Sequence, residues 1–216
     1  MKITVSKSFQ PLLDDSHRYL VLCGGRGSGK SEFAARKLFY RAMKEGGHRF
    51  LVMRKIRRTL KESVIKIFEA LLSENNIKFE YYSSDRKIVF NSPDGKRNEL
   101  LFEGLDDPEK IKSIKGITGI WIEEATEFSR DDFLVADLCL REPGPGYHQT
   151  ILTFNPDEAR AAWIKQMFFD EKRKDATVHV STIDDNPIRQ VREAYREQLE
   201  KLKLIDEALW KIYRLG

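Results

Sequence analysis

Apolar stretches and helical repeats alternate along this chain, as they do in proteins with a parallel β-sheet covered by helices on both faces. Four apolar runs and one alternating segment predict strands at Tyr19–Cys23, Arg49–Met53, Gly119–Glu123, Gln149–Phe154 and Thr177–Ser181. Apolar residues spaced along one helix face predict helices at Ser31–Lys44, Val64–Leu72, Asp131–Leu140, Ala159–Phe169 and Ile188–Tyr213. The pattern therefore predicts an α/β fold with a mostly parallel central sheet flanked by helices.

Three short strand-like segments interrupt this alternation in the middle of the chain. They lie at Phe79–Tyr82, Lys87–Phe90 and Glu99–Phe102, with a turn sequence at Ser92–Gly95 between the last two. Strands joined by tight turns pair in the antiparallel direction. We expect these segments to form a small antiparallel insertion at one edge of the sheet.

Composition narrows the class of protein without changing this picture. The 216 residues suffice for one α/β domain, and we interpret residues 1–216 as a single domain. The net charge of +4 permits a nucleic-acid partner but does not require one. Two cysteines indicate neither a disulfide framework nor a zinc site. Neither a signal peptide nor an apolar run of membrane-spanning length occurs, so the sequence predicts a cytoplasmic protein without membrane contact.

The strongest functional signal is a glycine-rich octapeptide that follows the first predicted strand. It fits the phosphate-binding P-loop pattern and reads Gly24-Gly25-Arg26-Gly27-Ser28-Gly29-Lys30-Ser31. The glycines let successive backbone N–H groups turn toward phosphate oxygens, and the next helix directs its positive dipole end at the same anion. Lys30 supplies a positive charge to the β- and γ-phosphates, and the Ser31 hydroxyl is a Mg²⁺ ligand. A plain glycine-rich connector is the alternative, but strand, loop and helix follow in the order that a nucleotide site requires.

Two adjacent acids at the end of the strand Gly119–Glu123 form the second signal, a Walker B pattern. One carboxylate at such a strand end holds the Mg²⁺ shell, and we assign this metal role to Glu123. The second, Glu124, is the predicted catalytic base, because it can orient and polarise the water that attacks the γ-phosphate. This pair predicts a hydrolase rather than a kinase. The alternative is that both acids only favour the start of the following helix through its dipole.

A third candidate is the segment Thr153–Pro156, at the end of the next predicted strand. Ligands of open parallel sheets lie beyond the carboxyl ends of the strands. Thr153 and Asn155 can therefore hydrogen-bond the γ-phosphate or the attacking water. The alternative is turn chemistry, because Asn-Pro commonly begins a turn.

Arginines and lysines near these motifs leave several alternatives open. Arg26, inside the P-loop, can reach the γ-phosphate of its own site or pair with a carboxylate. Arg141 follows a predicted helix and precedes a Pro/Gly-rich loop, so it can project into a neighbouring subunit's site or simply lie at the surface. The basic stretch Met53–Lys61 either follows a phosphate backbone, with Arg54 approaching the nucleotide, or forms a solvated helix face.

Taken together, these residues resemble the ATPase domain of the large terminase subunit of tailed bacteriophages. The resemblance covers nearly the whole chain and is carried by Arg18-Tyr19 before the P-loop, Arg54-Lys55, Ser113–Gly116, Trp121–Phe128, Leu140-Arg141, Thr153–Pro156 and Asp185–Pro187. In that family, Thr153 and Asn155 would belong to the motif that couples hydrolysis to movement. An N-terminal glutamine often contacts adenine there, and Gln10 is the candidate in this sequence.

The resemblance implies an ATP- and Mg²⁺-dependent motor that drives double-stranded DNA into a viral procapsid. The implied partners are the DNA, the portal of the procapsid, the small terminase subunit and further copies of the chain in a ring, with a monomer expected in isolation. The implied location is the host cell cytoplasm. Large terminases also carry a nuclease domain, so residues 187–216 are expected to lead into a linker, and this chain is expected to hydrolyse ATP without cutting DNA. A helicase-like or other P-loop nucleic-acid translocase is the alternative function.

Overall fold

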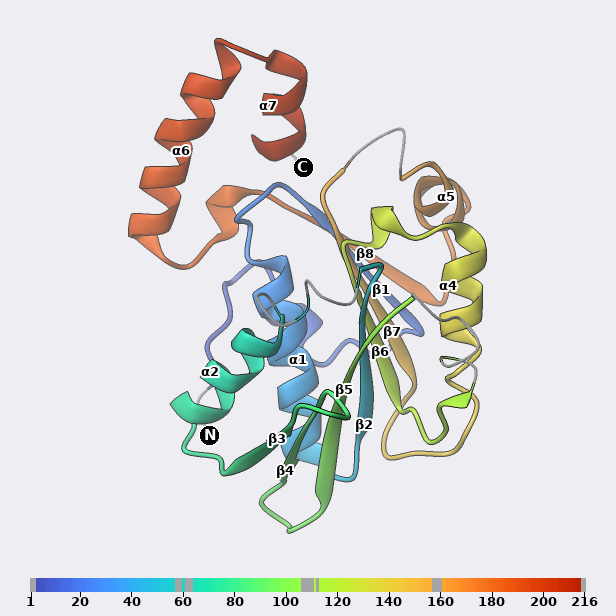
Figure 1. Ribbon diagram of the computed structural model, residues 1–216. Coiled ribbons are helices and arrows are strands. Elements are labelled where there is room, and N and C mark those ends of the chain that lie inside the picture. Colours follow the sequence, from blue (N-terminus) through green and yellow to red (C-terminus); the bar gives the residue numbers. More distant parts are fainter. Residues whose placement is uncertain are drawn as a thin grey trace.

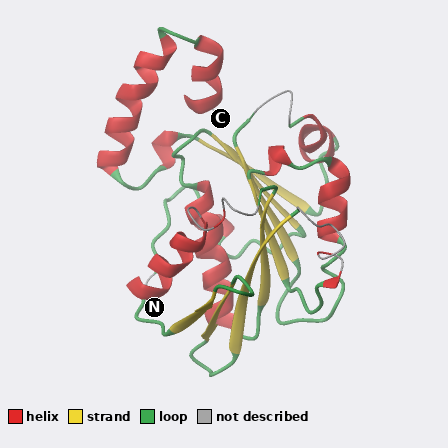
Figure 2. Cartoon of the chain, viewed as in Figure 1, coloured by secondary structure: helices red, strands yellow, loops and turns green. Residues whose placement is uncertain are grey.

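A single eight-stranded sheet forms the centre of the computed structural model, with helices on both faces (Figures 1 and 2). The structure describes residues 3–56, 60, 64–105, 111, 113–156 and 161–214. The strands are β1 (Tyr19–Gly24), β2 (Arg49–Arg54), β3 (Phe79–Tyr82), β4 (Lys87–Asn91), β5 (Arg97–Gly104), β6 (Gly119–Glu123), β7 (Gln149–Phe154) and β8 (Ala176–Ser181). Their spatial order is β3-β4-β5-β2-β6-β7-β1-β8.

Six of these strands run parallel, which gives the sheet two chemically different ends. The parallel pairs are β5 with β2, β2 with β6, β6 with β7, β7 with β1, and β1 with β8. We call the end where these strands finish the carboxyl end, and the end where they start the amino end. Among the described strands, only β4 is reversed: it pairs antiparallel with β3, at the far edge of the sheet, and with β5. The predicted antiparallel pairing of β3, β4 and β5 is thus confirmed, and β5 also pairs parallel with β2, so it joins the insertion to the main sheet.

The helices divide between the two faces because the strands alternate their apolar side chains. In β1, Leu20 and Leu22 face a core shared with α1 (Lys30–Glu45) and α2 (Lys66–Glu74). Val21 and Cys23 face a second core, which contains residues of α4 (Arg130–Asp137), α5 (Ala162–Ile164) and the π-helical segment η5 (Lys165–Asp170). Both faces of the sheet are therefore covered, as the near-continuous apolar strands predict.

The C-terminal region differs from the predicted single helix at Ile188–Tyr213. It consists of α6 (Arg189–Lys203) and α7 (Glu207–Arg214), which pack against each other. The break is made by Asp206, whose carboxylate accepts a hydrogen bond from the Leu209 backbone N–H and so caps α7. The sequence contains neither glycine nor proline at this point, so only the cap marks the break.

Two further sequence predictions are refined. In place of one helix over Ala159–Phe169, a short α5 continues into π-helical geometry, and residues 157–160 lie outside the described part. Cys23 and Cys139 are both buried and free. Among the described residues, none of the helices has the length and apolar character needed to cross a membrane.

Candidate functional site at the carboxyl end of the sheet

The predicted P-loop connects β1 to α1 at the carboxyl end of the sheet (Figure 1). Gly27 and Gly29 have positive φ angles of 77° and 93°, which glycine adopts without strain. The neighbouring strand β8 supports the loop: the Ser181 carbonyl accepts from the Gly25 N–H, and the Ser181 hydroxyl donates to the Ser28 hydroxyl at 3.0 Å. A side chain at Gly24 would overlap Ser181, so this contact requires glycine. The loop is thus held in a turned conformation by its own backbone and by β8.

Lys30, the first residue of α1, lies buried inside this turn. Its ammonium donates to the Asn155 side-chain oxygen at 2.6 Å and to the Gly25 carbonyl at 3.3 Å. Burial lowers the pKa of Lys30, while the nearby carboxylates of Glu123 and Glu124 act in the opposite direction. The structure therefore joins the P-loop lysine directly to Asn155 of the Thr153–Pro156 segment.

Glu123, at the end of β6, is joined to the P-loop and to β7. Its carboxylate accepts from the Ser31 hydroxyl at 2.8 Å and from the Thr153 hydroxyl. Thr153 in turn accepts a hydrogen bond from Trp121 Nε1 at 2.8 Å and is fully buried. Burial raises the pKa of Glu123, and these two hydrogen bonds partly offset that effect. A hydroxyl beside a carboxylate provides the hard oxygen ligands that Mg²⁺ prefers, so Ser31 and Glu123 fit the predicted metal role.

Glu124 directly follows this strand and has an unusual backbone conformation. Its φ and ψ angles are both 54°, in the left-handed region that residues other than glycine rarely adopt. Such strained positions persist where the surrounding structure imposes them, and they cluster at active sites. The side chain is half-buried, and its charge raises the pKa of Glu123. The structure therefore places a second carboxylate next to the buried one.

A cavity of about 550 Å³ opens beside the start of α1. Phe9 and Phe33 line it and stack on each other with ring centroids 4.8 Å apart, and Ile188 and Val191 add apolar surface from the chain after β8. Gln10, predicted to contact adenine, is exposed in the short 3₁₀-helix η1 (Gln10–Leu12) and does not line this cavity. Its neighbour Phe9 does, and nothing in the local sequence distinguishes the two positions.

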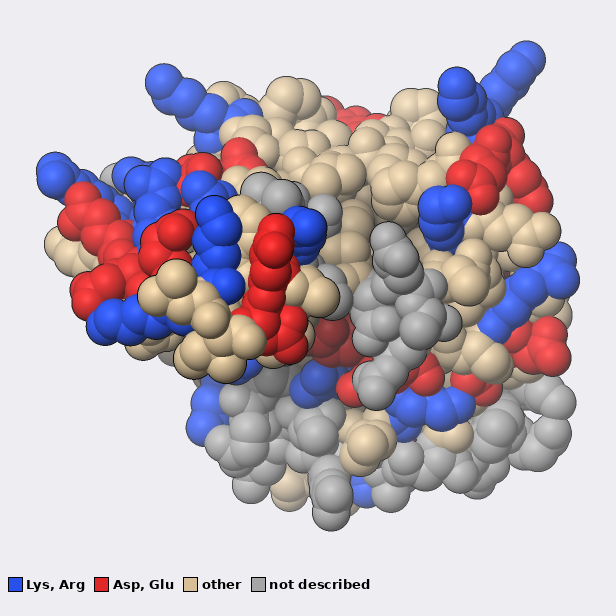
Figure 3. All heavy atoms as spheres, turned by 90° about the horizontal axis from the view of Figure 1, so that it is seen from above, with Lys and Arg blue, Asp and Glu red and all other residues tan. Residues whose placement is uncertain are grey.

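The α6–α7 pair lies over the P-loop, a contact that the sequence did not predict. The Asn186 side-chain nitrogen donates to the Gly27 carbonyl at 2.7 Å, and the Tyr195 ring packs beside Gly27. The backbone of Tyr213, near the end of α7, leaves no room for a side chain at Gly25. Viewed from this end, Figure 3 shows acidic and basic side chains intermixed over α6 and α7. Residues about 160 to 190 positions apart in the sequence thus complete the surroundings of the P-loop.

The two candidate arginines lie at opposite ends of the sheet. Arg26 is exposed in the P-loop, and its charge lowers the pKa of Lys30. Arg141 is also exposed, but it follows α4, which returns from the carboxyl end to the amino end of the sheet. Within the basic stretch Met53–Lys61, residues 57–59 and 61 lie outside the described residues. Arg54 is half-buried, and its Nε has no hydrogen-bond partner among the residues that the structure describes.

Comparisons with known proteins agree with this geometry. The sequence model of the family described as phage terminase large subunit matches residues 16–216. The chain is 30% identical over 236 residues to the PBSX phage terminase large subunit of Bacillus subtilis, which covers 98% of this chain and 53% of that protein. It is 30% identical over 234 residues to the terminase large subunit of Bacillus phage SPP1, which covers 100% of this chain and 54% of that protein. This chain therefore spans about half the length of the curated relatives that it matches.

A solved structure supports the fold independently. The large terminase of a thermophilic bacteriophage superposes with a TM-score of 0.82 at 19% sequence identity, over 99% of this chain and 53% of that one. The same terminase in complex with ADP gives a TM-score of 0.81 at 18% identity, with the same coverage. At this level of identity, the likeness concerns the fold.

Proposed function

We propose a function from one premise: this chain belongs to the phage terminase large subunit family. We infer that it hydrolyses Mg·ATP at the carboxyl end of the sheet. In the whole protein, hydrolysis would drive double-stranded DNA into a procapsid. The observation that carries the proposal is the contact network in which Lys30, Ser31 and the buried Glu123 meet the end of β7. Such convergence at the ends of parallel strands is typical of nucleotide sites.

ATP binding follows from the P-loop and the cavity beside it. The backbone N–H groups of the loop and the first turn of α1 would bind the phosphates, and Lys30 would exchange its contact with Asn155 for the β- and γ-phosphates. The cavity lined by Phe9, Phe33, Ile188 and Val191 has the apolar surface suited to a base. The ADP complex of the related large terminase supports this choice of ligand.

Ser31 and Glu123 would hold Mg²⁺, Ser31 through its hydroxyl and Glu123 through its carboxylate or a bound water. When bound, the ion neutralises charge on the β- and γ-phosphates. Thr153 would act through Glu123: its hydroxyl fixes the carboxylate, and the buried Trp121 fixes Thr153. The role expected for Thr153 is therefore to orient the acid rather than to contact the phosphate.

Glu124 would take the proton of the attacking water. Its left-handed backbone directs the chain away from β6 immediately after Glu123, so the two carboxylates occupy different positions although they are adjacent in sequence. Asn155, released from Lys30 when phosphate binds, would be free to contact the γ-phosphate or the water. Loss of the γ-phosphate would restore the contact between Lys30 and Asn155. The position of the Asn155 side chain would therefore depend on whether ATP has been hydrolysed.

A positive charge to stabilise the transition state would come from Arg141 of a neighbouring subunit. Arg141 lies at the amino end of the sheet, away from the P-loop of its own chain, so it can serve only another subunit's site. An arginine supplied in this way accelerates comparable hydrolases by about 10³–10⁵-fold. Arg26 is the candidate within the same chain. A subunit ring on the portal, with the small terminase subunit as a further partner, is the assembly that this arrangement fits.

The experiment that tests this proposal separates the two acids. Glu124→Gln should retain Mg·ATP binding but lose hydrolysis by about 10²–10⁴-fold, the range for a positioned general base. Glu123→Gln should also raise the Mg²⁺ concentration needed for half-maximal turnover. Glu127→Gln, at an exposed position one turn away, is the matched control and should remain active. Equal loss of metal affinity in both acid variants would contradict the assigned roles.

A further inference from the structure

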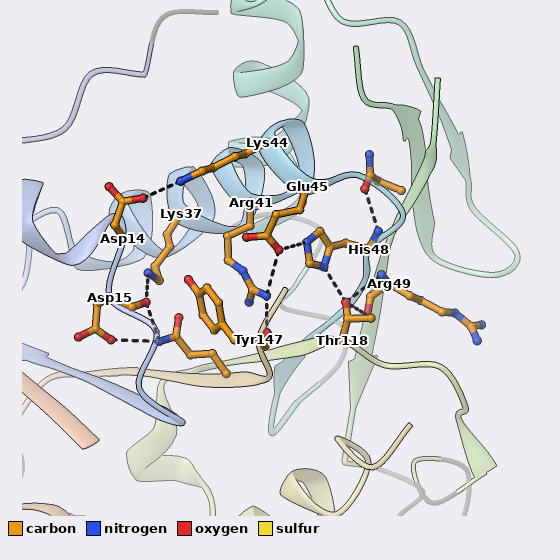
Figure 4. Close-up of polar contacts among 12 residues, drawn as sticks. Asp14, Asp15, Lys37, Arg41, Lys44, Glu45, His48, Arg49, Thr118 and Tyr147 are labelled. Carbon is orange, nitrogen blue, oxygen red and sulfur yellow. Dashed lines mark hydrogen bonds and ion pairs between the residues drawn. The ribbon is translucent and has the colours of Figure 1, made fainter. Parts of the chain in front are cut away.

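A second buried polar cluster lies at the amino end of the sheet, at the far end of α1 from the P-loop (Figure 4). It is made by the last turns of α1, the segment between α1 and β2, the start of β6 and the segment before β7. Its principal members are Arg41, Glu45, His48, Thr118 and Tyr147. None of them touches the P-loop network, so the proposed chemistry does not account for them.

Arg41 is the central residue of this cluster. Its side chain is only 1% exposed, and its guanidinium donates to the Tyr147 carbonyl while lying 3.9 Å from the centroid of the Tyr147 ring. The Glu45 carboxylate lies 3.7 Å from the same guanidinium group. Arg41 thus holds both the backbone and the ring of Tyr147.

Stability alone does not explain a buried arginine here. Arg41 Nε and Nη1 are buried and lack hydrogen-bond partners among the described residues. Unpaired polar atoms raise the cost of burying a charge, and apolar residues often replace buried ion pairs without loss of stability. A long apolar residue would fill this volume, but it could not donate a hydrogen bond to the Tyr147 carbonyl. The contact with Tyr147 is therefore the feature that requires arginine.

Glu45 is held in place by His48. His48 Nε2 lies 2.8 Å from the Glu45 carboxylate, and Nδ1 lies 3.0 Å from the Thr118 hydroxyl. The imidazole stacks on Phe50, and burial together with the charge of Arg41 lowers its pKa to about 3, so it is neutral. The fixed Glu45 carboxylate lies directly against Gly146, where it leaves no room for a side chain.

These contacts hold one end of the segment that carries Arg141. At the other end, Asp137 accepts hydrogen bonds from three side chains at the amino end of the sheet: Arg18, just before β1, at 2.9 Å, Tyr19 at 2.9 Å and Thr150 at 2.8 Å. Next to Arg141, the Glu142 carboxylate accepts from the Gly116 N–H at 2.9 Å. The segment 138–146 is thus fixed at Asp137, Glu142 and Tyr147, with Arg141 exposed between the first two points.

We propose that Arg41 and Tyr147 are positioning residues that set the direction in which Arg141 leaves the surface toward a neighbouring subunit. This inference rests on the proposed trans role of Arg141. It has a structural consequence. Helix α1 begins at the phosphate site of its own subunit, and its last turns contact Tyr147, in the segment that positions Arg141 toward the neighbouring subunit. At 1.5 Å per residue, the 16 residues of α1 span about 24 Å between these two points.

The test uses Arg41→Lys, which keeps the charge but lacks the planar group that lies on the ring, and Tyr147→Leu, which removes the ring. Both should lower kcat of the assembled protein by about 10²-fold, the cost of a small misplacement of a catalytic group. The KM for ATP and the thermal midpoint should stay close to wild type. Tyr147→Phe keeps the ring and the carbonyl, so this matched control should be unchanged.

Mixing variants distinguishes positioning from general damage. Arg41→Lys subunits have an intact ATP site, so mixing them with Glu124→Gln subunits, whose Arg141 is intact, should restore part of the activity. Mixing them with Arg141→Ala subunits should restore none, because both lack a competent Arg141. Recovery with Arg141→Ala but not with Glu124→Gln would overturn the proposal, as would full activity of Arg41→Lys and Tyr147→Leu alone.

Two other outcomes are also decisive. If both Arg41→Lys and Tyr147→Leu lose the cooperative thermal transition, these residues serve the fold and the proposal is wrong. The reference mixture is Arg141→Ala with Glu124→Gln. If that mixture recovers nothing while each variant still assembles, the trans role of Arg141 itself fails. Recovery in the reference mixture, combined with wild-type behaviour of Arg41→Lys, rejects only the positioning role.

Discussion

Helix α1 contains two buried lysines whose hydrogen-bond partners differ in kind. Lys30 begins α1 at the carboxyl end of the sheet, and Lys37 lies two turns later with no exposed surface. Lys37 donates to three backbone carbonyls, those of Leu12, Leu13 and Asp15, at 2.7, 3.0 and 2.7 Å. Lys30 has one backbone carbonyl at 3.3 Å and one short bond to the Asn155 side chain.

The difference lies in whether the partners can be exchanged. The three acceptors of Lys37 are backbone atoms of one segment, so they saturate the ammonium group and fix that segment against α1. Burial lowers the pKa of Lys37 to about 7, and the three hydrogen bonds of its ammonium group all go to backbone carbonyls. The main partner of Lys30 is a side chain that can rotate away when phosphate arrives. A buried charge with a replaceable partner indicates a ligand site, whereas one with fixed partners indicates architecture.

The largest expected effect comes from replacing each of the two lysines in turn. Lys30→Ala should lower ATP turnover by about 10²–10³-fold or more, because a positioned cationic donor to the phosphates is lost. Lys37→Met should keep turnover but lower the free energy of unfolding by about 2 kcal/mol or more, since buried carbonyls lose their donor. Steady-state ATPase assays and denaturant titrations of both variants measure this. Wild-type turnover in Lys30→Ala would show that the P-loop assignment is wrong.

A smaller effect distinguishes the roles proposed for Thr153, near the end of β7, and Asn155, directly after this strand. Thr153→Val removes a hydrogen bond to Glu123 and should weaken Mg²⁺ activation by about 10-fold, the lower range for a residue that orients a metal ligand. Asn155→Ala should leave Mg²⁺ activation and ATP binding largely intact while slowing hydrolysis. Turnover as a function of Mg²⁺ and ATP concentration separates the two. If both variants lose activity only together with their thermal transition, the segment serves as a turn.

The last expected effect leaves catalysis unchanged and concerns how stability depends on pH at the amino end of the sheet. His48 is neutral and faces Glu45, Thr118 and Arg41, with a pKa of about 3 instead of 6.5. The unfolded chain therefore binds more protons between pH 6.5 and 3, so the contribution of His48 to stability is lost as pH falls through this window. Over the whole window it amounts to on the order of 5 kcal/mol.

The measurement is the difference in unfolding free energy between wild type and His48→Gln. This difference should shrink steadily from pH 7 to pH 4. The same change at the partly exposed His148 controls for the loss of an imidazole. A difference that stays constant over this range would mean that His48 has the same pKa in the folded and the unfolded protein.

The two clusters also differ in how far the sequence predicted them. The P-loop, Glu123 and the end of β7 were identified because their chemistry lies at strand ends, and parallel strands bring those ends together whatever the details of packing. The roles of Glu124, Arg26 and Arg141 remain predictions. The separate roles that we propose for Thr153 and Asn155 depend on the structure, since only packing places Thr153 between Trp121 and Glu123.

The amino-end cluster could not have been predicted in the same way. Arg41 and Tyr147 are 106 residues apart, and an arginine at the end of a helix normally indicates an exposed face. The α6–α7 break and the contact of Asn186 with Gly27 were missed for a related reason. The contact depends on a side chain meeting a distant backbone group, and the break depends on a local cap by Asp206; neither leaves a periodic pattern in the sequence.

The claim that Lys30, and not Lys37, belongs to a ligand site is tested most directly by the stabilisation that Mg·ATP gives each variant. A ligand at a hundred times its Kd raises the free energy of unfolding by about 2.7 kcal/mol. Wild type and Lys37→Met should both show this gain in denaturant titrations with and without Mg·ATP, although Lys37→Met starts from a lower stability. Lys30→Ala should show little or none. Equal stabilisation of Lys30→Ala and wild type, or loss of the gain in Lys37→Met alone, would contradict the assignment of the nucleotide site.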